Sequence, residues 1–182
     1  MSEERKAFIF DTNFIIQYKD MIKVVEELSD NFTVYVTQVS IGERIAQQTR
    51  ELKSTYEKLQ KIEEEHKEIV NLQYKFSFEN RSSFINNGMQ ENYRRAFNNM
   101  IIPLNLNQET FAKLIERSHK KTPPFSQFES DKGFKDTLLW LSLLNYFIEQ
   151  GEDQIVFVTD DKGFLSNKDA LIDEFVALTG KK

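Results

Sequence analysis

Residues 6–13 read KAFIFDTN, and the interpretation of the whole chain starts from this stretch. Residues 7–10 are apolar without a break, and Asp11 opens the polar turn that follows. An unbroken apolar run of this length is typical of a strand that is buried on both faces, as in parallel sheets. Because ligand sites in open α/β folds lie beyond the carboxyl ends of such strands, Asp11 stands where a functional side chain is expected.

Strand and helix patterns alternate along the chain after this stretch. Apolar residues at helical spacing predict a helix over residues 14–28, and a β-branched and aromatic run predicts a strand at 32–36. This order indicates a parallel sheet, so we expect an α/β protein with three layers, α/β/α, and a central, mainly parallel sheet. The later elements predicted are a connection at 37–42, a long helix at 43–74, a helix at 108–120, an apolar helix at 137–148, a buried strand at 155–158 and a last helix at 170–178.

The middle of the chain carries a long polar helix with a thin apolar stripe. Between residues 43 and 74 the apolar side chains recur at close to heptad spacing, and Glu, Lys, Gln and Arg fill most other positions. A stripe so narrow packs against one neighbour only. We therefore expect a single domain over residues 1–182, with a helical arm inserted at 45–107 that folds back on itself.

The composition excludes several kinds of active site. With no Cys in the chain, disulfides and cysteine nucleophiles are absent, and two His are too few for a histidine zinc centre. A metal ion would therefore have oxygen ligands, which favours Mg²⁺ or Mn²⁺. The net charge of −5 argues against a general basic nucleic-acid binder. Neither a membrane-spanning apolar run nor an apolar leader occurs, so we expect a cytoplasmic protein without membrane contact.

Acidic residues stand where the chain leaves the predicted buried elements. Asp11 follows the first strand, Glu43 opens the helix after the second strand, and Asp136 opens the apolar helix. Asp160 and Asp161 follow the last strand. In a parallel sheet these positions converge on one crevice, where the carboxylates repel one another and raise each other's pKa values. A divalent cation removes this repulsion, so we expect one or two Mg²⁺ or Mn²⁺ ions here.

A cluster of this kind suits the metal-assisted hydrolysis of phosphodiesters. A bound cation lowers the pKa of a water molecule, and a second ion about 3.5–4 Å away can stabilise the leaving oxygen. No protein nucleophile is needed, which agrees with the absence of Cys. Cationic side chains near the acids would then contact the substrate backbone. The candidates are Lys132, Lys135, Arg44 and Lys121.

Three segments and one further residue resemble a known family. The segments are FIFDTNFII at 8–16, KDTLLWLSLL at 135–144 and VFVTDDKGF at 156–164, and the residue is Glu43. In this order they resemble the PIN domain, a metal-dependent nuclease fold with Asp-Thr-Asn after its first strand and Thr-x-Asp near its end. The long middle of the chain differs from the short toxin members of the family and is similar to a larger bacterial subgroup.

The resemblance implies a role for each matching side chain. The implied catalytic residues are Asp11, Glu43, Asp136 and Asp161, the implied metal ligands are these four and Asp160, and the implied supporting residues are Thr12, Asn13 and Thr159. The implied activity is that of an Mg²⁺- or Mn²⁺-dependent endoribonuclease acting on single-stranded RNA, with DNA as a second substrate. A role as a toxin or defence protein would bring an inhibitory protein partner, and the arm is the expected surface for this partner or for a homodimer.

Three other functions stay open at this point. A phosphatase of the haloacid-dehalogenase type also has an Asp after a buried strand, but its chemistry needs a second Asp where this chain has Asn13. A catalytically silent PIN scaffold could bind nucleic acid or protein, because a fold does not fix a function. DNA cleavage of the flap-nuclease type uses the same metal chemistry, and the sequence does not separate it from RNA cleavage.

Overall fold

The computed structural model describes residues 6–17, 21–67, 78–125, 133–150, 152 and 154–181, and these residues contain one parallel sheet. The strands lie in the order β3-β2-β1-β4, and each neighbouring pair is parallel. The predicted α/β fold with a mainly parallel sheet is therefore confirmed. The strands are β1 (Lys6–Phe10), β2 (Thr33–Thr37), β3 (Ile101–Ile102) and β4 (Gln154–Val158).

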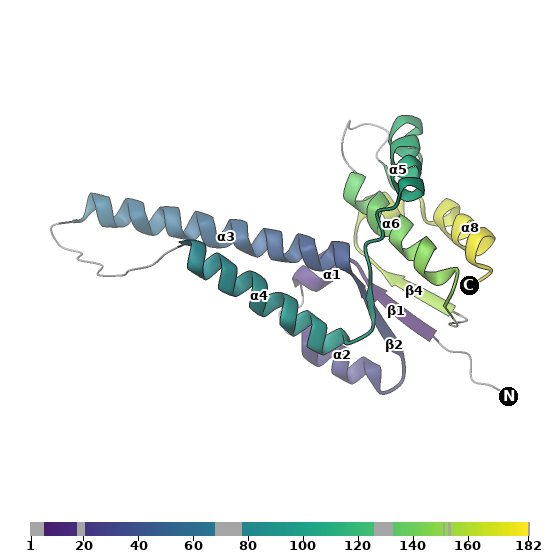
Figure 1. Ribbon diagram of the computed structural model, residues 1–182, viewed down its shortest axis with the longest axis horizontal. Coiled ribbons are helices and arrows are strands. Elements are labelled where there is room, and N and C mark those ends of the chain that lie inside the picture. The colour runs from purple at the N-terminus through teal and green to yellow at the C-terminus, as the bar shows by residue number, and fades with distance from the viewer. Residues whose placement is uncertain are drawn as a thin grey trace.

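Helices cover both faces of the sheet (Figure 1). Side chains of β1 alternate between the two layers, since Ile9 belongs to one apolar cluster and Phe10 to the other. Burial on both sides is the reason that β1 is apolar throughout. The first layer contains α1 (Thr12–Gln17), α2 (Met21–Ser29), α3 (Gln38–Glu65) and α4 (Phe78–Phe97), and the second contains α5 (Gln108–Lys120), α6 (Phe134–Phe147), α7 (Lys162–Leu165) and α8 (Lys168–Thr179).

Three strands end at the same level of the sheet. Phe10 pairs with Val36 of β2 on one side and with Val158 of β4 on the other. The residues that follow these strands therefore meet at one carboxyl edge. The chain moves outward from β1 to β2 and β3, and then returns to β4 on the opposite side of β1. This reversal of strand order is the position where open α/β folds bind ligands.

Helix α3 begins earlier than the sequence pattern predicts. Thr37 is both the last residue of β2 and the N-cap of α3, and its Oγ1 accepts a hydrogen bond from the Ser40 amide at 3.0 Å. The predicted connection at 37–42 is therefore wrong, because strand and helix share Thr37 and leave no loop between them. Glu43 consequently lies in the second turn of α3 and does not open the helix.

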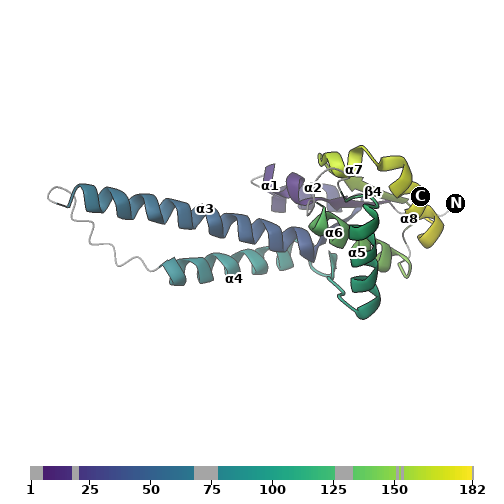
Figure 2. The ribbon, with the colours of Figure 1, turned by 90° about the horizontal axis from the view of Figure 1, so that it is seen from above.

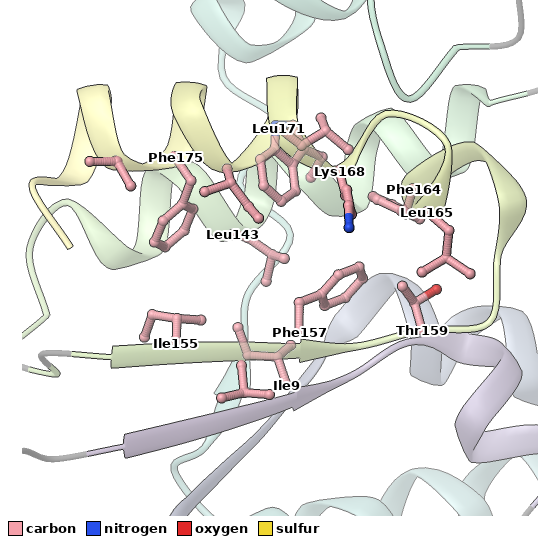
Figure 3. A pocket seen from close by; sticks show the side chains of 14 residues that line it. Ile9, Leu143, Ile155, Phe157, Thr159, Phe164, Leu165, Lys168, Leu171 and Phe175 are labelled. Carbon is pink, nitrogen blue, oxygen red and sulfur yellow. The ribbon is translucent and has the colours of Figure 1, made fainter. Parts of the chain in front are cut away.

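Strand β4 is an edge strand, although its sequence predicts a fully buried one. Val156 is 39% exposed, and no strand among the described residues pairs with the outer edge of β4. Its other face, with Ile155 and Phe157, looks toward α8 across an apolar cavity of about 320 Å³ (Figure 3). None of the described residues that line this cavity is acidic, so the cavity contains none of the carboxylates of the sheet edge.

Helices α3 and α4 form an antiparallel pair that extends away from the sheet (Figures 1 and 2). Thr49 of α3 donates a hydrogen bond to Asn86 of α4 at 2.9 Å, and the rings of Tyr56 and Phe78 lie 6.0 Å apart. The insertion predicted over residues 45–107 is too long, because β3 belongs to the sheet.

Two other predicted helices differ in extent from the observed ones. The helix predicted at 14–28 is present as α1 and α2, with residues 18–20 outside the described ranges. The end of the helix predicted at 43–74 also falls outside them, beyond residue 67. No helix within the described ranges is long and apolar enough to cross a bilayer.

A partly buried ion pair holds the second helical layer together. Glu174 of α8 pairs with Arg117 of α5 and also accepts a hydrogen bond from the Trp140 indole of α6 at 2.8 Å. The side chains of Arg117 and Glu174 are only 11% and 28% exposed. Since α6 carries Asp136, this contact also fixes part of the carboxyl edge.

Glu174→Ala is expected to lower the free energy of unfolding by about 2–3 kcal/mol, because it leaves the Arg117 charge half-buried and unpaired. Urea denaturation monitored by Trp140 fluorescence measures this loss. The control is Glu116→Ala, which removes an exposed partner of Lys120 on α5 and should leave the stability close to that of wild type. Equal losses in the two variants would contradict a bracing role for Glu174.

Candidate active site

Asp11 lies at the carboxyl end of β1 and is 4% exposed. Its Oδ1 accepts a hydrogen bond from the Thr12 amide at 2.6 Å, and its Oδ2 accepts one from the Thr159 hydroxyl at 2.7 Å. Burial raises the pKa of Asp11, and these two donors act in the opposite direction. The negative charges of Asp161 and Glu43 raise the pKa further, which shows that these acids lie close by.

Glu43 reaches the same edge from α3. Its Oε2 accepts a hydrogen bond from the Thr12 hydroxyl at 2.7 Å, and its Oε1 pairs with the Lys135 ammonium at 2.7 Å. Glu43 thus joins the start of α1 to the start of α6. The late position of Glu43 within α3 does not remove it from the cluster, because its long side chain extends to Thr12.

Asp161 follows β4 and caps α7. Its Oδ1 accepts a hydrogen bond from the Gly163 amide at 2.6 Å, while its own amide donates to the Thr159 hydroxyl at 3.0 Å. Its neighbour Asp160 is exposed and accepts a hydrogen bond from Gln17 of α1 at 3.1 Å. The geometry therefore places Asp161 with the other acids and turns Asp160 toward α1.

Asp136 lies in the first turn of α6, and the pKa of its carboxyl group is raised well above the ordinary value. Burial raises its pKa from the ordinary 3.8 to about 6, with further contributions from the charges of Asp161, Asp11 and Glu43. Lys135 acts in the opposite direction. Asp136 accepts no hydrogen bond from any described residue, so its pKa lacks the lowering effect that two donors have on the pKa of Asp11. The four acids thus behave as one electrostatic unit.

Two glycines fit against the backbone that precedes α6. A Cβ atom at Gly133, whose φ is +104°, would lie 2.7 Å from the Phe125 Cα and 2.9 Å from the Pro124 carbonyl oxygen. A Cβ atom at Gly163 would lie 3.3 Å from the same Pro124 oxygen. The Pro124 carbonyl is thus packed between the segments that carry Asp136 and Asp161, and it fixes their separation.

Not every candidate residue contacts the acids. Asn13 makes no hydrogen bond to Asp11 within the described part of the chain, and Thr12 and Thr159 support Asp11 instead. Arg44 bonds to Gln47 at 3.2 Å and to the Tyr93 hydroxyl, so it lies between α3 and α4. The Lys121 ammonium lies 5.9 Å from the centre of the Phe125 ring. Lys132 falls outside the described residues.

The sequence did not indicate how the acids are joined to one another. Thr12 and Thr159 each bridge two acids, but a Thr beside an Asp is too common a pattern to reveal such a bridge. The ion pair between Lys135 and Glu43 was equally hidden, because its members are far apart in the chain. The Gly two residues after Asp161 is the one local signal, since it is typical of a capped turn.

The donor atoms of the cluster are of the type that binds a divalent cation. All of them are carboxylate or hydroxyl oxygens, which Mg²⁺ and Mn²⁺ prefer. Among the described residues, however, no group of three or more His, Asp or Glu side chains is arranged to hold a metal ion. Asp11, Glu43 and Asp161 are each held by protein donors, and mutual repulsion opposes their closer approach. The donor set is therefore suitable in chemistry but is not closed around an ion.

Asp136→Asn is expected to stabilise the metal-free protein at pH 7.5. A carboxyl group whose folded pKa is raised to about 6 stabilises the fold below its unfolded value of 3.8, and this contribution is lost as the pH rises through 6. The resulting penalty at pH 7.5 is on the order of 1–2 kcal/mol after solvent screening, and the amide removes it.

Urea denaturation in EDTA at pH 4 and at pH 7.5 measures this effect. The stability gain of Asp136→Asn over wild type should be small at pH 4 and should increase toward pH 7.5. Asp173→Asn removes an exposed acid of α8 and serves as the control, with the same small effect at both pH values. A gain for Asp136→Asn that does not depend on pH would contradict the electrostatic origin of the shift.

Comparison with known proteins agrees with the fold. No curated protein and no solved structure matches the chain at the significance required. A family model described as the PIN domain matches residues 8–164, a range that contains the second half of β1, all four acids and β4. This match extends over most of the 182 residues, and the chain therefore belongs to the PIN domain family.

Proposed function

We propose that the chain is an Mg²⁺- or Mn²⁺-dependent endonuclease that hydrolyses phosphodiester bonds of single-stranded RNA. PIN domains are in general nucleases, which supports hydrolase activity at the level of the family. The observation that carries the proposal is the meeting of Asp11, Glu43 and Asp161 at the carboxyl edge, where hydrogen bonds to Thr12 and Thr159 connect them. Asp136 lies close enough for the charges of these acids to raise its pKa. Neighbouring acids raise the pKa values of Asp11 and Asp136, and a bound cation would neutralise this negative charge.

Asp11, Asp136 and Asp161 would hold one ion, and Glu43 would hold a second ion or bind the first through water. When bound, the cation supplies a water of lowered pKa and neutralises charge on the scissile phosphate. Thr12 and Thr159 hold the carboxylates of Asp11 and Glu43 in fixed orientations through the hydrogen bonds described above. Such preorganisation avoids reorientation of these groups during the reaction.

Lys135 would act on the substrate backbone. Its ammonium now pairs with Glu43, but its side chain is 60% exposed and can turn toward solvent. A cation that occupied the site would weaken the attraction between Glu43 and Lys135, which would free the ammonium for a phosphate oxygen. An inhibitory partner or a second copy bound to the α3–α4 arm stays a prediction, as does the role of a toxin or defence protein.

The test is cleavage of labelled single-stranded RNA and DNA in Mn²⁺, with and without EDTA. Asp11→Asn should reduce the rate by about 100-fold or more, because the loss of one metal-binding carboxylate removes several kcal/mol of stabilisation from the transition state. Asp173→Asn, which changes the same charge on the surface of α8, should cleave at the wild-type rate. Cleavage that persists in EDTA, or an Asp11→Asn variant as fast as wild type, would exclude the proposal and leave a binding scaffold.

Gly163→Ala tests the orientation of Asp161. The added Cβ atom would lie 2.8 Å from the Asp161 Oδ1 and 3.3 Å from the Pro124 carbonyl oxygen, so the carboxylate must rotate away and the Pro124 backbone must shift by a few tenths of an ångström. We expect cleavage in Mn²⁺ to fall by about tenfold, in the range found when groups that orient metal ligands are lost. The control is Gly88→Ala in α4, whose new Cβ atom would meet nothing within 4 Å. Unchanged cleavage by Gly163→Ala would remove Asp161 from the proposed ligands.

A further inference from the structure

An open cavity of about 670 Å³ lies where the α3–α4 arm joins the sheet, and we call it the arm-root cavity. Its walls come from the first turns of α3, the last turns of α4, the segment after β3 and the start of α6. A volume of this order is typical of small-ligand sites. The cavity is distinct from the apolar one between β4 and α8, since the two share no lining residue.

The arm-root cavity is continuous with the acid cluster. Glu43 and Lys135, which form the ion pair at the carboxyl edge, are also part of its lining. A polymer that placed one phosphate at the acids would therefore place the adjoining unit in the cavity. This continuity restricts the occupant to a group that is covalently next to the proposed scissile phosphate.

The lining combines an apolar surface with polar groups. Ala46, Leu104 and Leu138 contribute the apolar part, and Gln38, Gln90 and Arg94 contribute amides and a guanidinium. The Gln38 Oε1 accepts a hydrogen bond from the Leu104 amide at 3.0 Å, which orients the Gln38 amide. A nucleobase has the matching form, with apolar faces and a hydrogen-bonding edge.

Small residues of α3 keep the cavity open. Gly42 and Ala46, one turn apart on α3, both line it, and a Cβ atom at Gly42 would meet nothing within 4 Å. The antiparallel contact between Thr49 and Asn86 sets the register of the two helices. Two turns further along α4, Arg94 is therefore level with the start of α3, close to Glu43 and Lys135.

We propose that the arm-root cavity binds the nucleotide that flanks the scissile phosphate of a single-stranded RNA, with its base in the cavity and its far phosphate at Arg94. This inference rests on the function proposed above and extends it to the arm. Arg94 and Lys135 supply local positive charge for the phosphates in a chain whose net charge is −5. A base enters such a cavity only when it is unpaired, so single strands should bind better than duplexes.

The chain offers a matched pair of variants for the test. Arg94 and Arg95 are neighbours on α4, both pair with Glu91, and their side chains are 72% and 76% exposed, but only Arg94 lines the cavity. Arg94→Ala and Arg95→Ala therefore remove the same charge from the same exposed turn. Ala46→Trp is a second probe, because it fills the cavity from an exposed position on α3.

Binding is measured by the fluorescence anisotropy of a labelled single-stranded RNA 12-mer in Mn²⁺, with Asp11→Asn as the background to prevent cleavage. Arg94→Ala and Ala46→Trp should each weaken binding by about tenfold, the scale of one lost base or phosphate contact, whereas Arg95→Ala should bind like the background protein. A duplex of the same sequence should compete less well than the single strand. Equal affinity of the Arg94→Ala and Arg95→Ala proteins would overturn the proposal.

Cleavage kinetics separate this proposal from the one on which it rests. With Asp11 intact, Arg94→Ala should raise the KM for RNA about tenfold, whereas Arg95→Ala should keep the wild-type KM and the wild-type hydrolysis of bis(p-nitrophenyl) phosphate. That small diester has no base to occupy the cavity. Failure of wild type to hydrolyse either substrate would exclude the nuclease while the binding result still decides on the cavity. Normal RNA cleavage with an unchanged KM for Arg94→Ala would exclude the cavity alone.

Discussion

The parallel sheet brings four carboxylates to one edge, and the repulsion between their charges is the constraint on which the rest of the site depends. The level ends of β1, β2 and β4 leave the chain little freedom to separate Asp11 from Asp161. Burial makes this repulsion more costly, because little water remains to screen the charges. The pKa of Asp136 is raised to about 6 although it lies in the first turn of α6, where the helix dipole favours a negative charge.

Two threonines connect three of the four acids through hydrogen bonds. Thr12 donates through its amide to Asp11 and through its hydroxyl to Glu43, whereas Thr159 donates to Asp11 and accepts from the Asp161 amide. Three of the acids are thus connected through shared neighbours, and only Asp136 has no donor among the described residues. Hydrogen bonds from Thr12 and Thr159 lower the pKa of Asp11 against the effect of its burial, whereas no hydrogen bond from a described residue does so for Asp136. This asymmetry is difficult to explain as simple structural capping.

The sequence was sufficient for features that depend on local pattern. The apolar run at 7–10 predicts β1, and the four acids follow from where the buried elements end. The start of α3 was missed because Thr37 ends a strand and caps a helix in the same residue, so no turn residue separates the two patterns. The edge position of β4 was missed because strand order is a tertiary property. The pairing of Lys135 with Glu43 was missed for the same reason, since no sequence periodicity relates residues so far apart.

The arm changes what surrounds the acids without changing the acids themselves. Without the α3–α4 arm, the carboxyl edge of the sheet would open directly to solvent. In this chain α4 packs beside the start of α3, and the two helices form walls of the arm-root cavity. The acid cluster supplies chemistry that is indifferent to sequence, because every phosphodiester presents the same group. Any preference for one nucleotide over another must therefore come from groups that reach a base. Gln38, Gln90 and Arg94 are such groups beside the cluster, and two of them are on the inserted helix. Under the proposed function, the insertion would determine which strand is cut, while the acids at the edge of the sheet would carry out the cleavage.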